Sequence, residues 1–142
     1  MDKGSLVKEQ IDAGEMLIRK AQTSGLELTG GAWTQIDGDA KPYLYVVAPE
    51  TESNGVRQAY RKLGVAELAL MNEGVPRPSR VEPFTVKIIP PSHGLALGIA
   101  NQHRMYPDEY PSWHTDGMLG RVYAECAYIY PAKLFAPQPA AS

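Results

Sequence analysis

The sequence of 142 residues has one cysteine, little excess of either charge sign and no long apolar run. A single thiol, Cys126, cannot form an internal disulfide, which is typical of proteins from a reducing compartment. Fourteen Lys and Arg against 16 Asp and Glu give a net charge of −2, which excludes a strongly basic nucleic-acid binder. The apolar stretches fall far short of the roughly 18–20 residues of a membrane span. We therefore expect a cytoplasmic protein with no membrane association and no nucleic-acid partner.

The common signatures of catalysis and nucleotide binding are missing as well. The sequence contains no HExxH, no pair of CxxC motifs, no GxGxxG and no GxxxxGK[ST]. The first five residues, 1–5, lack the basic and then apolar stretch of a secretory leader, so no signal peptide is expected. Hydrophobic residues at 44% and charged residues at 21% are ordinary values for a globular protein. We predict one domain over residues 1–130, followed by a Pro/Ala-rich tail over residues 131–142.

Hydrophobic periodicity predicts the elements of this domain. Steps of three and four indicate helices, alternation indicates strands, and the turn residues Asp37-Gly38-Asp39 favour a hairpin between the first two strands. The predicted helices cover 5–23, 55–72 and 93–105, and the predicted strands cover 26–36, 43–48, 84–89 and 121–130. An antiparallel hairpin followed by strands that return through helices predicts an α+β fold. We expect a mixed four-stranded sheet (a hairpin plus parallel crossover strands) with about three helices, in the order αββαβαβ.

Residues 106–120 have no clear period and contain Pro107, Pro111, Gly117 and Gly120, so they are predicted to form a long loop. Loops of this length in a compact domain are often functional. Tyr110 and Trp113 are residue types that anchor protein interfaces, and both are predicted to bind a partner.

The same region holds a possible metal or acid–base site. His114 and Asp116, with His103 upstream and Glu125 on the last strand, are residue types that bind divalent metals or transfer protons. The alternative is that His114 and Asp116 make turn hydrogen bonds and that Glu125 lies on an exposed face. Because the spacing matches no known metal motif, no cofactor is expected.

Charge is distributed unevenly along the chain. Residues 53–104 hold seven Lys and Arg against three Asp and Glu, a balance of +4, whereas residues 1–52 have −4 and residues 105–142 have −2. Arg57 and Arg61 lie on the second predicted helix, and Arg104 ends the third. These three arginines are predicted to bind an acidic surface, and the alternative is an ordinary solvated helix face.

Several segments resemble small bacterial α+β proteins to which no function is assigned. They are Gly31-Ala32-Trp33, residues 43–49 (YLYVVAP), Ala59-Tyr60-Arg61, residues 83–89 (PFTVKII) and residues 127–131 (AYIYP). The resemblance implies a bacterial origin and a shared fold, and it implies no catalytic residues.

Two functions from different classes follow from these observations. The first is a non-catalytic cytosolic binding or accessory module that acts through protein–protein contacts or self-association. The alternative is a small metal-dependent hydrolase that uses the His, Asp and Glu residues of the 103–125 region. The absence of catalytic motifs favours the binding module.

Overall fold

The computed structural model describes residues 8–36, 38–82 and 84–135. The helices are α1 (Lys8–Thr23), α2 (Thr51–Asn54), α3 (Val56–Asn72) and α4 (Gly94–Met105), with short 3₁₀ turns η2 (Arg77–Ser79) and η3 (Ala132–Phe135). The strands are β1 (Gly30–Thr34), β2 (Tyr43–Val47), β3 (Val86–Ile89), β4 (Ser112–Leu119) and β5 (Val122–Ile129). The α+β class is confirmed. The helix predicted over 55–72 matches α3 closely, whereas the first residues of the helix predicted over 5–23, residues 5–7, lie outside the described residues.

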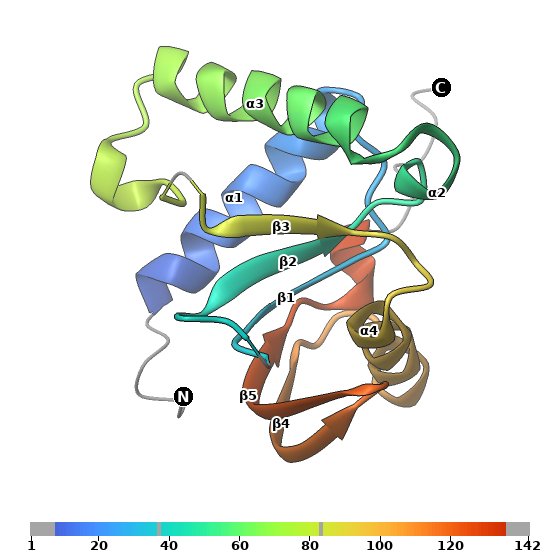
Figure 1. Cartoon of the computed structure of the whole chain (residues 1–142). Coiled ribbons are helices and arrows are strands. Elements are labelled where there is room, and N and C mark those ends of the chain that lie inside the picture. Colours follow the sequence, from blue (N-terminus) through green and yellow to red (C-terminus); the bar gives the residue numbers. More distant parts are fainter. Residues whose placement is uncertain (1–7, 37, 83, 136–142) are drawn as a thin grey trace.

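The sheet has five strands in the order β3-β2-β1-β5-β4, so the prediction of four strands is wrong (Figure 1). β1 pairs antiparallel with both β2 and β5, and β4 pairs antiparallel with β5. The single parallel pair joins β2 to β3 through α3. The hairpin and the parallel crossover from β2 to β3 are therefore as expected, whereas the last predicted strand, β5, is not a second parallel crossover strand but pairs antiparallel with β1. With the one-turn helix α2, the described residues form four α-helices, where about three were predicted.

The extra strand is β4, which occupies most of the predicted loop over 106–120. Its alternation is hard to detect because β4 is an edge strand with a partly exposed surface, interrupted at Asp116 by a positive φ of 42°. Pairing with β5 holds it in place: Trp113 lies opposite Tyr128, and Leu119 lies opposite Val122. Long-range pairing thus overrides a weak local pattern.

Helices cover each face of the sheet over only part of its width. α1 and α3 pack on one face, where Leu17, Leu63 and Leu70 join Val46 and other sheet residues in one core cluster. α4 packs on the other face, and its Leu95, Ala96 and Ile99 join the second cluster. In Figure 1, α3 lies at the top, α1 runs diagonally past β2 and β3 toward it, and α4 lies at the lower right beside β4 and β5.

The strand over 122–129 changes face in its middle. Regular alternation along the strand would put Val122, Ala124, Cys126 and Tyr128 on one face, but the structure departs from it. Ala124 and Ala127, three residues apart, both belong to the α4-side cluster, whereas Tyr128 packs on the α1 side. This break lies opposite the irregular backbone at Asp116, since Thr115 pairs with Cys126 and Gly117 pairs with Ala124. Cys126 is buried, as expected of a core cysteine.

Glycines let α4 approach the β4–β5 turn at backbone distance. A β-carbon added at Gly98 would lie 2.5 Å from the Gly120 nitrogen, and one at Gly120 would lie 2.1 Å from the Gly94 carbonyl oxygen. Gly120 has a φ of 66°, as expected at the first position of a two-residue hairpin turn. The Arg121 amide donates to the Gly94 carbonyl oxygen at 3.2 Å. The hairpin is therefore held against α4 by backbone contacts.

The packed structure continues past residue 130, where the sequence suggested that the domain ends. Leu134 and Phe135 in η3 are buried and belong to the α1-side cluster. The Lys133 amide donates to the Asp108 carbonyl oxygen at 2.8 Å, and Gln22 of α1 donates to the Leu134 carbonyl oxygen at 3.0 Å. The rest of the predicted tail, residues 136–142, lies outside the described residues.

Candidate functional site

A row of aromatic side chains runs from the core to the surface of the β4–β5 hairpin. Trp33 donates its indole N–H to the Tyr130 hydroxyl at 3.0 Å, and both side chains are buried. The Tyr130 ring meets the Tyr128 ring edge to face at 5.0 Å, and Tyr128 meets Trp113 in the same way at 5.2 Å. Such edge-to-face pairs hold each ring in a fixed orientation. The last two rings are only partly buried, so they form a rigid platform at the edge of the α1-side core.

Beyond this platform, past the exposed residues Thr115, Asp116 and Glu125, two further apolar side chains are exposed near the end of the hairpin. Met118 and Tyr123 lie opposite each other on the two strands, with exposed fractions of 61% and 44%. Their neighbours Leu119 and Val122 belong to the α4-side cluster, and successive strand residues point to opposite faces. Met118 and Tyr123 therefore face the α1 side, as Trp113 does. We call this set, Trp113, Met118, Tyr123 and Tyr128, the hairpin face.

The Tyr128 phenol lies in a negative environment at the rim of the hairpin face. Burial raises its pKa above the ordinary value, and the carboxylates of Glu15 and Asp12 on α1 raise it further. Asp12 pairs with Lys8 at 2.9 Å and Glu15 pairs with Arg19 at 3.2 Å, both in exposed positions. Tyr128 thus stays protonated at neutral pH and keeps a hydroxyl group for hydrogen bonding.

The predicted loop residues lie on β4 or just before it. Trp113 is on the hairpin face, and Tyr110, 64% exposed, immediately precedes the strand. The His114 Nε2 is 2.9 Å from the Gly117 carbonyl oxygen, which is the local hydrogen bond that the alternative interpretation predicted. Asp116 is exposed and has the left-handed backbone noted above. His114 and Asp116 are therefore part of a local irregularity in the backbone of the edge strand β4.

The residues considered for a metal site are not assembled into one. His103 of α4 uses its Nε2 atom to reach the Tyr130 carbonyl oxygen at 3.0 Å, and its ring packs beside Phe135. Glu125 is exposed on β5, whereas His114 is committed to Gly117. In the part of the chain that the structure describes, no three His, Cys, Asp or Glu side chains are grouped to hold a metal ion. The hydrolase alternative has no ligand set in that part.

The three predicted binding arginines occupy two different regions. Arg57 and Arg61 are exposed on α3, which packs beside β3 at one edge of the sheet. Arg104 is in the last turn of α4, where its guanidinium donates to the Asn101 side-chain oxygen at 3.4 Å. The hairpin face is at the opposite edge from β3. The arginines and Trp113 therefore do not form one continuous surface.

Met118 and Phe84 are two of the exposed apolar residues that no sequence pattern indicates. Met118 lies in the segment that was predicted to form a loop. Only its pairing with Tyr123 in the structure shows that it is part of an exposed apolar pair on a strand. Phe84, before β3, is 94% exposed and has a φ of 65°. A bulky residue in the left-handed region is rare, and such residues cluster at functional sites. No periodic pattern in the sequence signals this conformation.

Comparison with known proteins returns no relative: no family model, curated protein or solved structure matches the chain. The resemblance to bacterial α+β proteins therefore stays a prediction. Among the described residues, no helix is long and apolar enough to span a membrane. Any function must be argued from the fold and its surfaces.

Proposed function

We propose that this protein is a non-catalytic cytosolic module that binds protein surfaces through the hairpin face, with a second copy of the chain as partner. The observation that carries the proposal is the exposed cross-strand pair of Met118 and Tyr123, on the same hairpin as the rigid Trp113–Tyr128 platform. Adjacent exposed apolar side chains are characteristic of interaction sites, and Tyr and Trp dominate binding energy at interfaces. No catalytic group is required in this proposal.

A suitable partner surface exists on the chain itself. Arg57, Arg61, Val65 and Leu68 are exposed and recur at four- and three-residue steps along one side of α3, which we call the α3 face. The α3 face belongs to the basic middle of the sequence, whereas residues 105–142, which include the hairpin, have a balance of −2. The α3 face carries Arg57 and Arg61, the hairpin belongs to an acidic segment, and both surfaces expose apolar side chains. Contact between the hairpin face of one copy and the α3 face of another is therefore favoured.

The experiment measures self-association by sedimentation velocity over a wide range of protein concentration. The double variant Met118→Thr/Tyr123→Thr removes apolar side chains at exposed strand positions while it keeps a β-compatible residue. The double variant Arg57→Glu/Arg61→Glu reverses charge on the α3 face. We expect both variants to shift the equilibrium toward monomer and added salt to weaken wild-type association.

A matched control is Leu97→Gln, which removes an exposed apolar side chain from α4, outside both surfaces. It is expected to associate like the wild type. A wild type that is monomeric at every concentration, or a hairpin variant that associates normally, would overturn the proposal. If only the hairpin variant dissociates, the hairpin face is supported and the α3 face is rejected as its partner.

A further inference from the structure

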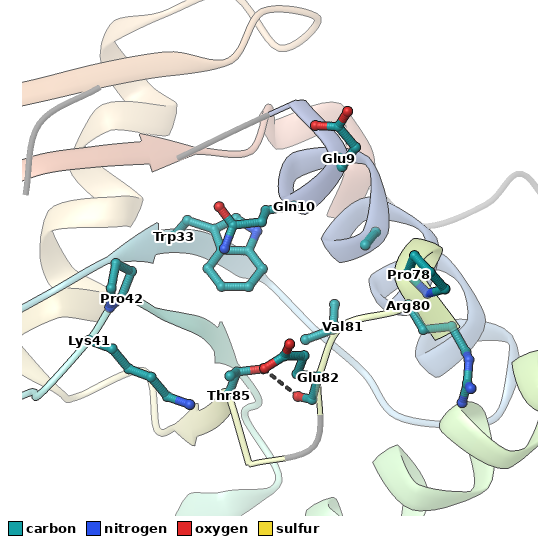
Figure 2. Close-up of a pocket in the computed structure, with 11 residues that line it drawn as sticks. Glu9, Gln10, Trp33, Lys41, Pro42, Pro78, Arg80, Val81, Glu82 and Thr85 are labelled. Atoms are coloured by element: carbon teal, nitrogen blue, oxygen red, sulfur yellow. Dashed lines mark hydrogen bonds between the residues drawn. The ribbon is translucent and has the colours of Figure 1, made fainter. Parts of the chain in front are cut away.

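Two adjoining cavities lie between α1 and the segment that leads from η2 to β3; Trp33 of β1 lines the first, and residues of α3 line the second. The first has a volume of about 320 Å³, and the second has about 270 Å³. Arg80, Val81 and Glu82 line both. Figure 2 shows the first cavity, with Trp33 and Gln10 on one side and the Arg80 side chain extending away from Trp33 toward α3. The guanidinium therefore reaches toward the second cavity.

The second cavity combines apolar walls with charged side chains of both signs. Leu17 from α1, Leu70 and Met71 from α3, and Val81 supply the apolar lining. Arg77 and Arg80 supply two guanidinium groups from the connecting segment, and Glu67 and Glu82 supply two carboxylates. Its volume is close to the lower end of the range for small-molecule sites, which are mostly apolar with a few polar groups that fix orientation.

Arg80 has an unsatisfied hydrogen-bond donor at this place. Its Nε atom is buried and has no hydrogen-bond partner within residues 8–36, 38–82 and 84–135. A buried donor without a partner is costly, and a donor on a charged group more so. An anionic ligand that accepts from the Arg80 guanidinium would remove this cost. Arginine is also well suited to carboxylates, because its donors match the two carboxylate oxygens.

Glu67 of α3 lines the same cavity, and its negative charge opposes the binding of an anionic ligand to Arg80. It is partly buried, and burial raises the pKa of its carboxyl group, whereas the positive charge of Arg80 acts to lower it. Nevertheless, no ion pair between Glu67 and Arg80 is present among the described side chains. Glu67 therefore attracts the Arg80 guanidinium electrostatically, but it accepts no hydrogen bond from the buried Arg80 Nε atom.

From this arrangement we infer that the cavity lined by Arg80, Arg77, Leu17, Leu70 and Met71 binds a small organic carboxylate with an unbranched apolar chain. The carboxylate accepts hydrogen bonds from Arg80, and Arg77 adds positive charge. The chain lies against the three apolar side chains from α1 and α3. This site is separate from the hairpin face, so the inference does not depend on the proposed function.

The test uses isothermal titration calorimetry with three probes at constant pH and salt. Octanoate has both the anion and the chain, octanol has the chain alone, and acetate has the anion alone. We expect octanoate to bind at least about tenfold more tightly than either of the others, because a charge-assisted hydrogen bond and apolar burial act together. Octanol binding as tightly as octanoate, or no binding of octanoate, would reject the carboxylate site.

Two variants with opposite expected effects separate binding from folding. Arg80→Gln is expected to weaken octanoate binding by about tenfold to a hundredfold, whereas Glu67→Gln is expected to strengthen it, because it removes a competing negative charge. Arg121→Gln, an exposed arginine in the β4–β5 turn outside the cavity, serves as the control and is expected to bind like the wild type. Circular dichroism establishes that each variant is folded. Unchanged affinity in folded Arg80→Gln, or weaker binding in Glu67→Gln, would overturn the inference.

Discussion

Gly14 of α1 lies so close to Tyr130 that a β-carbon at residue 14 would be 2.2 Å from the Tyr130 hydroxyl oxygen. That hydroxyl accepts from the Trp33 indole and donates to the Ile11 carbonyl oxygen at 2.6 Å. The close approach thus lets α1 rest directly on a buried hydrogen-bond network. The absence of one side chain fixes the distance between this helix and the sheet.

The first prediction concerns this close approach. Gly14→Ala is expected to lower the free energy of unfolding by about 1–3 kcal/mol, because the overlap outweighs the better helix propensity of alanine. Gly64→Ala on α3 is the matched control, since no atom lies within 4 Å of its added β-carbon. That variant is expected to gain up to about 1 kcal/mol. Urea unfolding of both variants measures the difference, and equal effects would refute the steric argument.

The second prediction concerns the Trp33–Tyr130 hydrogen bond. Tyr130→Phe leaves the Trp33 indole N–H and the Ile11 carbonyl without their partner, at an expected cost of about 1–3 kcal/mol. Trp33→Phe is expected to be destabilising as well. Because the two side chains share one bond, the double variant should cost less than the sum of the single variants. A double-mutant cycle from denaturant unfolding checks this, and strict additivity would contradict it.

The third prediction concerns the Asp39 carboxylate, whose side chain is 3% exposed. Burial acts to raise its pKa, but hydrogen bonds from Lys87 at 2.7 Å, Tyr45 at 2.5 Å and the Ile36 amide at 3.1 Å outweigh burial and lower it. A lowered pKa in the folded state means that ionised Asp39 contributes stability above about pH 3.9. This contribution is lost as the pH falls through the folded-state pKa.

Asp39→Asn is therefore expected to cost about 1–3 kcal/mol at pH 7, and the difference from the wild type should shrink below pH 4. Unfolding by urea at a series of pH values measures this. Asp12→Asn, which removes an exposed partner of Lys8, is the control and should change stability by less than about 1 kcal/mol. A gap between Asp39→Asn and the wild type that stays constant with pH would contradict the assignment.

The fourth prediction concerns His103. Burial lowers its pKa below the ordinary value, although the hydrogen bond to the Tyr130 carbonyl and the charge of Asp108 act in the opposite direction. Since a carbonyl only accepts, the proton of the neutral ring is on Nε2. The unfolded state binds the extra proton more readily, so this histidine reduces stability as the pH falls below about 6.5. NMR titration of the His103 ring in the folded protein should give a pKa below 6.5, and a higher value would refute the prediction.

The sequence was informative where periodicity coincides with burial. Leu17, Ile18 and Leu63 lie on their helices at the spacing of a buried stripe. Gly30 and Gly31 lie within the first predicted strand, where neighbouring side chains approach the backbone closely. Added β-carbons there would meet Ile99 at 2.8 Å on one face and Ile18 at 3.2 Å on the other. Such features are local, so one segment is enough to predict them.

β4, the hairpin face and the Arg80 cavity depend instead on segments far apart in the chain. Met118 becomes recognisable only when β5 places Tyr123 opposite it. Arg80 appears in the sequence as one more cation in a basic stretch, and its buried donor depends on α1 and α3 together. Sequence periodicity contains no information about such tertiary contacts.

The backbone contact between Gly98 and Gly120 also bears on how the protein can vary. Because main-chain atoms make this contact, it constrains no outward-facing side chain of the hairpin. The exposed residues Met118 and Tyr123 can therefore be exchanged for other strand-compatible residues without altering the angle between the hairpin and its supporting helix. Substitutions at these exposed positions can therefore change which partner the hairpin binds while the hairpin keeps its position on α4, provided that Gly98 and Gly120 are retained.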